Sequence, residues 1–312
     1  MVKTHFSELQ KKILKLAGKE GAISTQMVVE KLHTSPVTAS RNLIKLKQGG
    51  YLGQKGMGRG TFYIPAIGTQ LKELEDLKQE LDSYRPFPEP LVEKIDAMLS
   101  TRFIYATRSI EGATLPLRET ALILAGASVK GNREEIADVL HQEKTLELVT
   151  DFVKNRRELS EDFIKELQKE VTSNVLDIML NGVYRDHEAG IAKSTRLFPG
   201  PGEIRKRMAA LVTTISRLET KAMYPAIIAA YAHYQFLAIH PFADGNGRTA
   251  RLLMNAILLK HHFPITIIES GKRQQYYQAL QKADEGAYEI FEAFAFSAIK
   301  ESLEFYLKLV RP

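Results

Sequence analysis

Cysteine is absent from this chain of 312 residues. A disulfide framework and a thiolate nucleophile are therefore both excluded, which fits a reducing compartment. The first ten residues, MVKTHFSELQ, lack the apolar core of a signal peptide, so secretion by that route is not expected. The longest apolar stretch, residues 222–239, contains Pro225, His233 and Gln235 and predicts a buried helix rather than a membrane span. We expect a cytoplasmic protein without a membrane partner.

Acidic residues are scarce in the N-terminal part of the chain. Residues 1–65 contain 11 Lys and Arg residues against 3 Glu and no Asp, a net charge of +8. Because the whole chain carries +6, residues 66–312 sum to −2, and the basic charge belongs to the N-terminal segment. The hydrophobic content is 44%, and we find no internal repeat and no low-complexity tract. Together with the length, this is typical of a globular protein with two domains or one sizeable core.

The N-terminal segment, residues 1–65, shows three helical patterns followed by an alternating stretch around Gly-Met-Gly-Arg-Gly. Ser24 is a candidate N-cap of the second helix, and Ser35 followed by Pro36 supplies a cap and a first-turn proline for the third. The alternating stretch predicts a hairpin. Three helices and a hairpin resemble a winged helix-turn-helix, a small α+β domain.

In a winged helix-turn-helix the third helix enters a major groove and the wing lies along the DNA. The resemblance implies five DNA-contact candidates, which are Thr38, Arg41, Asn42 and Lys45 on the helix and Arg59 on the wing. A basic helix face can also be merely solvated, and winged helices also serve as protein-binding or dimerisation modules. DNA binding should weaken steeply as salt rises, because neutralised phosphates release counterions.

The rest of the chain predicts a mainly α protein. Residues 66–90 combine a strongly polar helical pattern, which suits a connector or dimer surface, with the proline-rich linker RPFPEP at 85–90. Helical patterns follow from residue 91 onward, including amphipathic ones at 134–155 and 160–180.

Residues 240–251 read HPFADGNGRTAR and place several potential catalytic and ligand-binding residues close together. The glycines let the backbone turn sharply and bring N–H groups close to an anion, at what the following pattern predicts to be a helix N-terminus. Arg248 and Arg251 are three residues apart and share one helix face. Asp244 offers a hard oxygen ligand suited to Mg²⁺ held together with phosphate, and His240 can take a proton near neutral pH. The combination points to chemistry on a nucleotide phosphate.

This segment matches the signature H-P-F-x-x-acidic-or-small-G-N-G-R-x-x-R, and the chain resembles the Fic (Fido) family. The resemblance implies a Fic-type helical domain with a β-hairpin flap, and transfer of AMP from ATP to a hydroxyl of a target protein or of the chain itself. His240 would deprotonate the hydroxyl and Asp244 would hold Mg²⁺. The ATP-binding residues of the signature would be Asp244, Gly245, Asn246, Gly247, Arg248, Thr249, Ala250 and Arg251.

Two further stretches resemble parts of this family. RQQYYQALQKA, residues 273–283, is similar to an element that lines the nucleoside pocket, which implies that Tyr276, Tyr277 and Asp284 contact the nucleotide; the family often has Asn at the last of these positions. Turn-forming residues between Gly182 and Pro201 predict a hairpin similar to the family's flap, which clamps the target by strand addition. The residues that would then lie over the nucleotide are Lys193, Ser194, Thr195 and Arg196.

The sequence TRSIEGATL, residues 107–115, resembles the family's inhibitory pattern S/T-x-x-x-E-G/N, with Thr107, Glu111 and Gly112 at the specified positions. We expect the Glu111 carboxylate to reach Arg251 and to occupy the arginine that the γ-phosphate of ATP needs. The same carboxylate could instead orient a water for removal of AMP. A helix-ending Glu-Gly is the structural alternative.

The expected domains are a winged helix-turn-helix at 1–65, a connector at 66–90, N-terminal Fic helices at 91–154, the catalytic Fic domain at 155–300 and a helix end at 301–312. The expected partners are ATP, an unknown target protein, a second copy of the chain in a homodimer, and DNA bound through residues 1–65. Competing functions are a Doc-like protein kinase, in which Lys replaces the second glycine of the nest, and a DNA-binding regulator with a nucleotide-sensing Fic domain. A metal hydrolase based on His261 and His262 is a third, but no HExxH-type spacing accompanies them.

Overall fold

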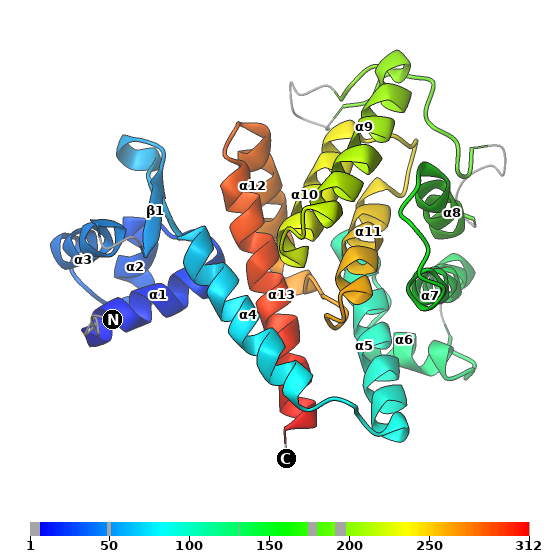
Figure 1. Cartoon of the computed structure of the whole chain (residues 1–312), viewed down its shortest axis with the longest axis horizontal. Helices are drawn as coiled ribbons and strands as arrows, with labels where there is room; N and C mark the ends of the chain where they lie inside the picture. Colours follow the sequence, from blue (N-terminus) through cyan, green and yellow to red (C-terminus); the bar gives the residue numbers. More distant parts are fainter. Residues whose placement is uncertain (1–6, 49–50, 131, 174–179, 191–197, 312) are drawn as a thin grey trace. The chain divides into compact units, whose positions relative to one another are not determined.

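The computed structural model describes residues 7–48, 51–130, 132–173, 180–190 and 198–311. Helices dominate these residues, and their one two-stranded sheet is an antiparallel hairpin, so the predicted mainly α fold class is confirmed (Figure 1). The chain divides into two compact units. The first contains residues 1–85 and 274–311, and the second contains residues 86–273.

The N-terminal part of the first unit has the predicted three helices and hairpin. The elements are α1 (Glu8–Glu20), α2 (Thr25–Leu32), α3 (Pro36–Gln48), β1 (Leu52–Lys55), the 3-10 turn η1 (Gly58–Gly60) and β2 (Phe62–Pro65). Ser24 caps α2 by accepting from the Met27 N–H, and Ser35 accepts from the Thr38 N–H at the start of α3, as predicted.

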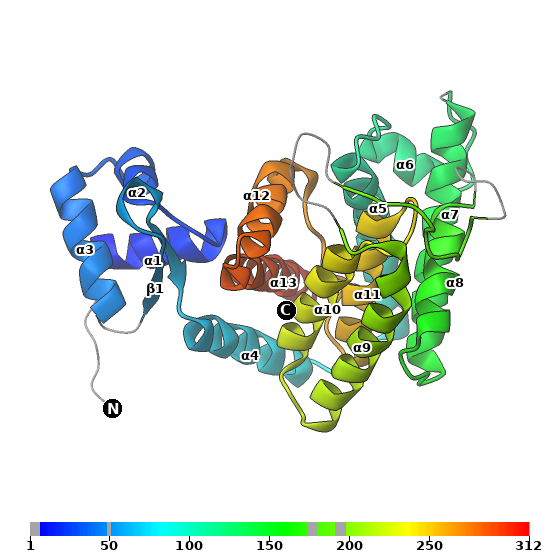
Figure 2. The ribbon, with the colours of Figure 1, turned by 90° about the horizontal axis from the view of Figure 1, so that it is seen from above.

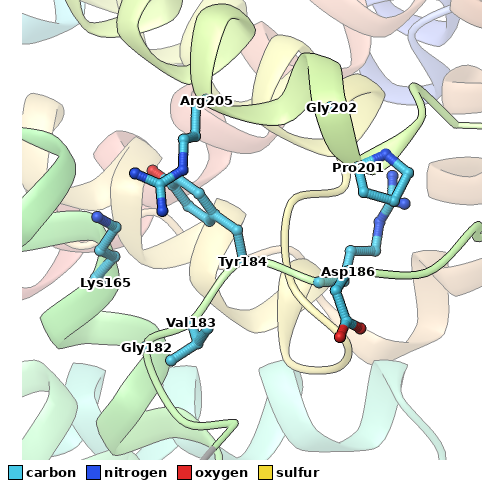
Figure 3. Close-up of a pocket in the computed structure, with 9 residues that line it drawn as sticks. Lys165, Gly182, Val183, Tyr184, Asp186, Pro201, Gly202 and Arg205 are labelled. Carbon is cyan, nitrogen blue, oxygen red and sulfur yellow. The ribbon is translucent and has the colours of Figure 1, made fainter.

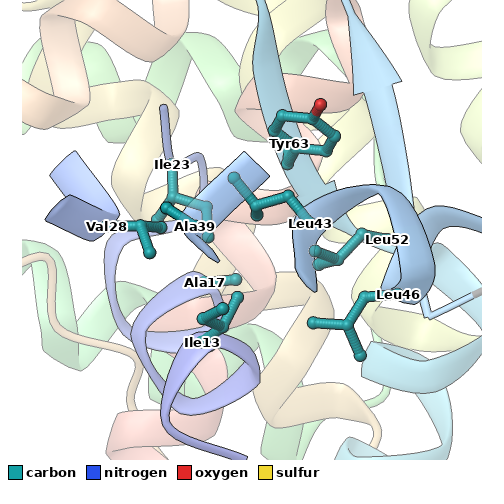
Figure 4. Packing of buried hydrophobic residues seen from close by; sticks show 9 residues of the cluster. All are labelled: Ile13, Ala17, Ile23, Val28, Ala39, Leu43, Leu46, Leu52 and Tyr63. Carbon is teal, nitrogen blue, oxygen red and sulfur yellow. The ribbon is translucent and has the colours of Figure 1, made fainter. Parts of the chain in front are cut away.

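A small apolar core holds this part together (Figure 4). All three helices and both strands contribute buried side chains, so the five elements share one core. The members are Ile13, Ala17, Ile23, Val28, Ala39, Leu43, Leu46, Leu52 and Tyr63. In the hairpin, Leu52 pairs with Pro65 and Lys55 with Phe62. Gly56 has φ +76°, and a Cβ there would collide with the Gly60 carbonyl oxygen, so the turn requires glycine.

Helices from both ends of the chain complete the first unit. They are α4 (Ile67–Ser83), α12 (Arg273–Asp284) and α13 (Tyr288–Val310). α13 packs along α4 and also contacts α1 and β2 (Figure 2). Gln70 donates to the Ala293 carbonyl, and Arg311 makes a two-bond contact with Glu80. These contacts explain why residues 274–311 group with the N-terminal segment; the five-part domain division predicted from the sequence remains a prediction.

The second unit is a bundle of helices around α11. Its elements are α5 (Glu89–Ile110), α6 (Leu117–Leu124), α7 (Arg133–Lys154), α8 (Glu161–Val171), α9 (Pro201–Thr220), α10 (Pro225–Ile239), α11 (Asn246–Lys260) and the 3-10 turn η2 (Ser270–Lys272). α11 contacts α5, α7, α8 and α10, and both ribbon views place it between α10 and α7. Its residues from Arg248 to Leu258 are all buried, so whatever its N-terminus holds is rigidly placed.

Two sequence expectations change in detail. The helix expected at 160–180 ends at Val171, where Thr172 turns its hydroxyl back to Gln168 and Asn181. The apolar stretch 222–239 forms α10, which starts only at Pro225, and no helix among the described residues is long and apolar enough to cross a membrane.

Candidate functional site

The loop from α10 to α11 carries the first functional residues. His240 ends α10 in the left-handed region with φ 50°, and Gly245 precedes α11 with φ +78°. The Asn246 side chain closes the loop, because its Oδ1 accepts from the Phe242 N–H at 3.1 Å and its Nδ2 donates to the Phe242 carbonyl at 2.8 Å. Asn246 therefore shapes the loop with its side chain, and its role in binding phosphate remains a prediction.

The His240 ring lies flat against the Phe198 ring, with centroids 4.0 Å apart and planes 9° apart. His240 also borders a cavity of about 590 Å³. The loop, the end of α5 and the start of α7 line this cavity with charged groups of both signs. The lining residues are Arg108, Glu111, Ala113, Asn132, Glu134, Glu135, Asp138, His240, Ala243, Asp244, Gly245, Asn246, Gly247 and Arg248.

Of the three residues of the inhibitory pattern, Glu111 lines this cavity and Thr107 contacts Arg251. Arg251, whose exposed fraction is 1%, donates from Nε to Thr107 Oγ1 at 2.7 Å and from Nη2 to Glu111 Oε1 at 2.6 Å. Glu111 is the residue that ends α5, and Gly112 follows it with φ +105°. A Cβ built on Gly247 would collide with Glu111 Oε1, so the carboxylate lies directly against the glycine nest. Glu111 thus binds Arg251 and also fills the space in front of Gly247.

A second ion-pair cluster was not predicted from the sequence. Asp138 on α7 accepts from Arg108 Nε at 2.5 Å through Oδ2 and from Arg248 Nη1 at 2.8 Å through Oδ1. Arg108 also donates to the Glu135 carbonyl at 3.0 Å, and its Nη1 is buried with no hydrogen-bond partner among the described residues. Asp138 therefore joins the inhibitory segment to the arginine of the signature. No local sequence pattern marks it, because its partners lie 30 and 110 residues away.

Asp244 suits a divalent cation held together with a phosphate. Its carboxylate is half exposed, lines the cavity and lies 3.7 Å from Arg248 Nη2, while its Oδ1 accepts from the Gly245 N–H. Among the described residues no group of three or more His, Asp or Glu side chains could hold a metal ion by itself. Mg²⁺ commonly keeps several waters and one or two carboxylates beside substrate phosphates, so one aspartate fits the role.

Comparison with known proteins identifies the domain that carries this site. Residues 158–258 match the model of the Fic/DOC family. Residues 158–258 form a Fic domain. The chain is 31% identical over 237 residues to the protein adenylyltransferase Fic of Drosophila persimilis, covering 73% of this chain and 46% of that protein. The corresponding protein of Drosophila ananassae is 32% identical over 206 residues, covering 65% and 41%. The chain thus spans less than half the length of these curated relatives.

Solved structures share the fold. A Fic domain containing signaling protein from Bacteroides thetaiotaomicron superposes with a TM-score of 0.71 at 26% identity, over 77% of this chain and 98% of that one. Fic-1 of C. elegans superposes with a TM-score of 0.69 over 96% of this chain and 84% of that one, at 22% identity, which supports the fold alone.

Several predicted nucleotide-binding residues are not among those that line the cavity, including Arg251 of the signature. Thr249 and Ala250 are fully buried in the packing of α11. Tyr276, Tyr277 and Asp284 belong to α12 in the first unit, where the buried Tyr276 ring packs 5.8 Å from that of Phe294. Their role in binding adenosine remains a prediction. Lys193, Ser194, Thr195 and Arg196 lie outside the described residues.

The stem of the predicted flap does lie among the described residues. Tyr184 forms an isolated bridge with Phe242, and the Phe198 N–H donates to the Ala189 carbonyl at 3.0 Å. A separate cavity of about 440 Å³ lies beside this stem, and in it Lys165 and Arg205 flank Tyr184 (Figure 3). The Tyr184 hydroxyl donates to Glu161 at 2.7 Å, and burial followed by this bond raises its pKa. The stem is therefore well anchored to the Fic domain.

The DNA-contact candidates lie on one element and one turn of the first unit. Thr38, Arg41 and Lys45 are exposed on α3 and Asn42 is half-buried, with its amide bound to the Thr38 carbonyl. Arg59 falls within η1, the turn of the hairpin.

His261, which the metal-hydrolase alternative would use, ends α11. Its Nε2 lies 3.8 Å from Glu219 Oε1.

Proposed function

We propose that this protein transfers AMP from ATP to a hydroxyl of a target protein or of itself. The observation that carries the proposal is one cavity bordered by an imidazole, a glycine nest at a helix N-terminus, a half-exposed carboxylate and Arg248. The nest and the positive end of the α11 dipole bind phosphate oxygens. The names of the curated relatives agree with this activity.

In the proposed step the hydroxyl oxygen forms a bond to the α-phosphorus while the bond to the bridging oxygen breaks, and pyrophosphate leaves. His240 takes the hydroxyl proton on a ring nitrogen. The main-chain N–H groups near Gly245 and Gly247 and the guanidinium of Arg248 stabilise charge on the phosphates. Mg²⁺ bound by Asp244 would neutralise phosphate charge. The protein contributes alignment and electrostatics rather than a covalent intermediate.

We further propose that Glu111 restrains this reaction. A triphosphate whose terminal group needs Arg251 must displace a carboxylate that is already 2.6 Å from its Nη2. ATP held beside the carboxylate would be misaligned, and an error of about 1 Å can lower a rate by about 10²-fold. Whether the same carboxylate also assists removal of AMP is a separate proposal, testable by incubating AMP-labelled protein without ATP.

The experiment uses Glu111→Gly as the active parent, because wild type is expected to be slow. The parent and the Glu111→Gly, His240→Ala double variant are incubated with Mg²⁺ and ATP, and intact mass is followed. We expect AMP units on the parent and none on the double variant. With radiolabelled ATP, label from the α-phosphate should reach protein. Transfer of the γ-label instead would assign the chain to the kinase class, and retention of transfer without His240 would refute its role as the base.

For the N-terminal segment we propose DNA binding through α3 and the hairpin turn, supported by the net charge of +8 and the exposed Arg41 and Lys45. A homodimer and a cytoplasmic location remain expectations from the sequence. Light scattering of the full chain at several concentrations tests the dimer directly.

A further inference from the structure

Arg185 lies in the stem of the predicted flap and has no role in the reaction proposed above. Its exposed fraction is 4%. Its Nε donates to the carbonyl of His240 at 2.8 Å, Nη1 to that of His187 at 2.6 Å and Nη2 to that of Pro199 at 2.5 Å. Its own N–H donates to the Pro241 carbonyl at 2.9 Å. One side chain therefore binds the loop at His240 and the main chain of the stem at His187 and Pro199.

The positive charge of the Arg185 guanidinium is stabilised by the dipoles of the three main-chain carbonyls that it binds. Among the described residues no ion pair includes Arg185; burial lowers its pKa, and only the more distant charge of Glu188 acts in the opposite direction. A buried cation is stable only when its donors are satisfied, and hydrogen bonds from a charged donor are about twice as strong as neutral ones. The three carbonyls are therefore held at fixed positions around a planar fork.

Those carbonyls fix the surroundings of the His240 ring. Pro199 follows Phe198, whose ring stacks on His240 with centroids 4.0 Å apart. His240 itself has φ 50°, a left-handed conformation that few non-glycine residues adopt. The fork thus grips the main chain of His240 and, through Pro199, the ring that packs against its imidazole.

We propose that Arg185 is a positioning residue that ties the flap stem to the His240 main chain and so keeps the base aligned for the chemical step. This inference rests on the proposed function, in which His240 takes the proton of the target hydroxyl. The fork holds the His240 main chain and the main chain at His187 and Pro199 in one arrangement. Arg185 would then raise the rate of the chemical step without contacting ATP.

The first test follows the His240 ring by NMR and needs no turnover. The chain has 8 histidines, and the His240→Ala variant assigns the ring signals of His240. Stacking on Phe198 shifts these signals upfield. We expect Arg185→Lys to move them toward the free-imidazole position, because lysine cannot bind three carbonyls at once. Arg205→Ala, which removes a cation near the same stem but has no bond to the loop, should leave them unchanged.

The second test measures AMP transfer in the Glu111→Gly parent. We expect Arg185→Ala to lower kcat by about 10²-fold, as for a misplacement of about 1 Å. The KM for ATP should stay within about twofold, since an interaction absent from nucleotide binding affects the chemical step alone. Millimolar guanidinium, far below the molar range that unfolds proteins, should restore part of the rate in Arg185→Ala but not in His240→Ala. Arg185→Lys replaces the alanine variant if the latter fails to fold.

The outcomes separate this inference from the proposed function. If the parent transfers no AMP, the proposed function fails, and the NMR shift alone decides the role of Arg185. If Arg185→Lys leaves both the His240 signals and kcat at parent values, the coupling is refuted. A loss shared equally by ATP affinity and rate, with no rescue, would also refute it, because that pattern belongs to general disruption of the domain.

Discussion

At the scale of single residues, three buried arginines of the Fic domain are held in three different ways. Arg251 is paired with Glu111, Arg248 shares Asp138 with Arg108, and Arg185 is surrounded by main-chain carbonyls. The first pair is the one that a triphosphate would have to break, because it lies against the glycine nest. The other two arrangements fix charged groups before any ligand arrives, as electrostatic catalysis requires.

His233 provides a residue-scale prediction about pH. It is fully buried on α10, and burial, with the nearby charge of Arg251 as the second cause, lowers its pKa to about 3. The unfolded chain takes up this proton below about pH 6.5 while the folded chain does not, so stability falls as the pH drops from that value toward 3. Between pH 6.5 and 5 this group should cost about 2 kcal/mol.

Urea unfolding of wild type and His233→Gln at both pH values measures this effect. The glutamine variant should lose less stability on acidification, by about 2 kcal/mol. Equal pH dependence in the two proteins would mean that His233 stays as easily protonated in the fold as in the unfolded chain.

The site residues that could be predicted from the sequence are those that lie together in one short segment. The resemblance of HPFADGNGRTAR and TRSIEG to family patterns implied that Glu111 meets Arg251, and the two side chains lie 2.6 Å apart. Asp138, Arg108 and Arg185 were not predicted, because the role of a buried charged side chain depends on groups that only the fold brings to it, and those groups lie on other helices or loops. The buried positions of Thr249 and Ala250 depend likewise on packing against neighbouring helices.

At the scale of elements, the turn into α11 sets the site. Gly245 has φ +78°, and a Cβ there would lie 2.7 Å from Thr172 Cγ2 at the end of α8. The Gln168 side chain on α8 also donates to the Asp244 carbonyl at 3.1 Å. The nest is therefore shaped by α8 as well as by its own glycines.

Gly245→Ala should destabilise the protein by about 2 kcal/mol or more, from the left-handed backbone and the crowding at Thr172. Gly202→Ala, on α9 with open space around the position, is the matched control and should change stability by less than about 0.5 kcal/mol. Thermal unfolding of both variants makes the comparison. Similar stabilities would show that the turn tolerates a side chain and that the nest is not constrained as described.

Helix caps were the most predictable feature at this scale, because Ser24 and the pair Ser35–Pro36 act through neighbours in sequence. The end of α8 at Val171 was not, since it depends on Thr172 bonding with Gln168 and Asn181 inside the fold.

At the scale of the whole molecule, charge and contacts divide the chain differently. The sequence places +8 on residues 1–65, yet contacts unite residues 1–85 with 274–311. Composition can reveal the first division. The second depends on pairs such as Gln70 with Ala293 and Glu80 with Arg311, more than 200 residues apart, which no local pattern records.

If the basic segment binds DNA, affinity for a labelled duplex should fall about 10²-fold over a roughly fourfold rise in salt, for about four neutralised phosphates. The Arg41→Ala, Lys45→Ala double variant should reduce the slope of log affinity against log salt by about 2. Fluorescence anisotropy provides both slopes. Binding that is insensitive to salt, or a double variant with an unchanged slope, would remove DNA from the expected partners and favour a protein-binding role for the segment.

The central claim is that Glu111 restrains AMP transfer by occupying Arg251 and the space before Gly247. Its most direct test is the initial rate of incorporation of α-labelled ATP into protein by wild type, Glu111→Gly and Ser109→Gly, the last adding a glycine near the same helix end while keeping the carboxylate. We expect Glu111→Gly to be faster than wild type by about 10²-fold and Ser109→Gly to match wild type. Equal rates for wild type and Glu111→Gly, with both proteins folded and binding ATP, would contradict the claim.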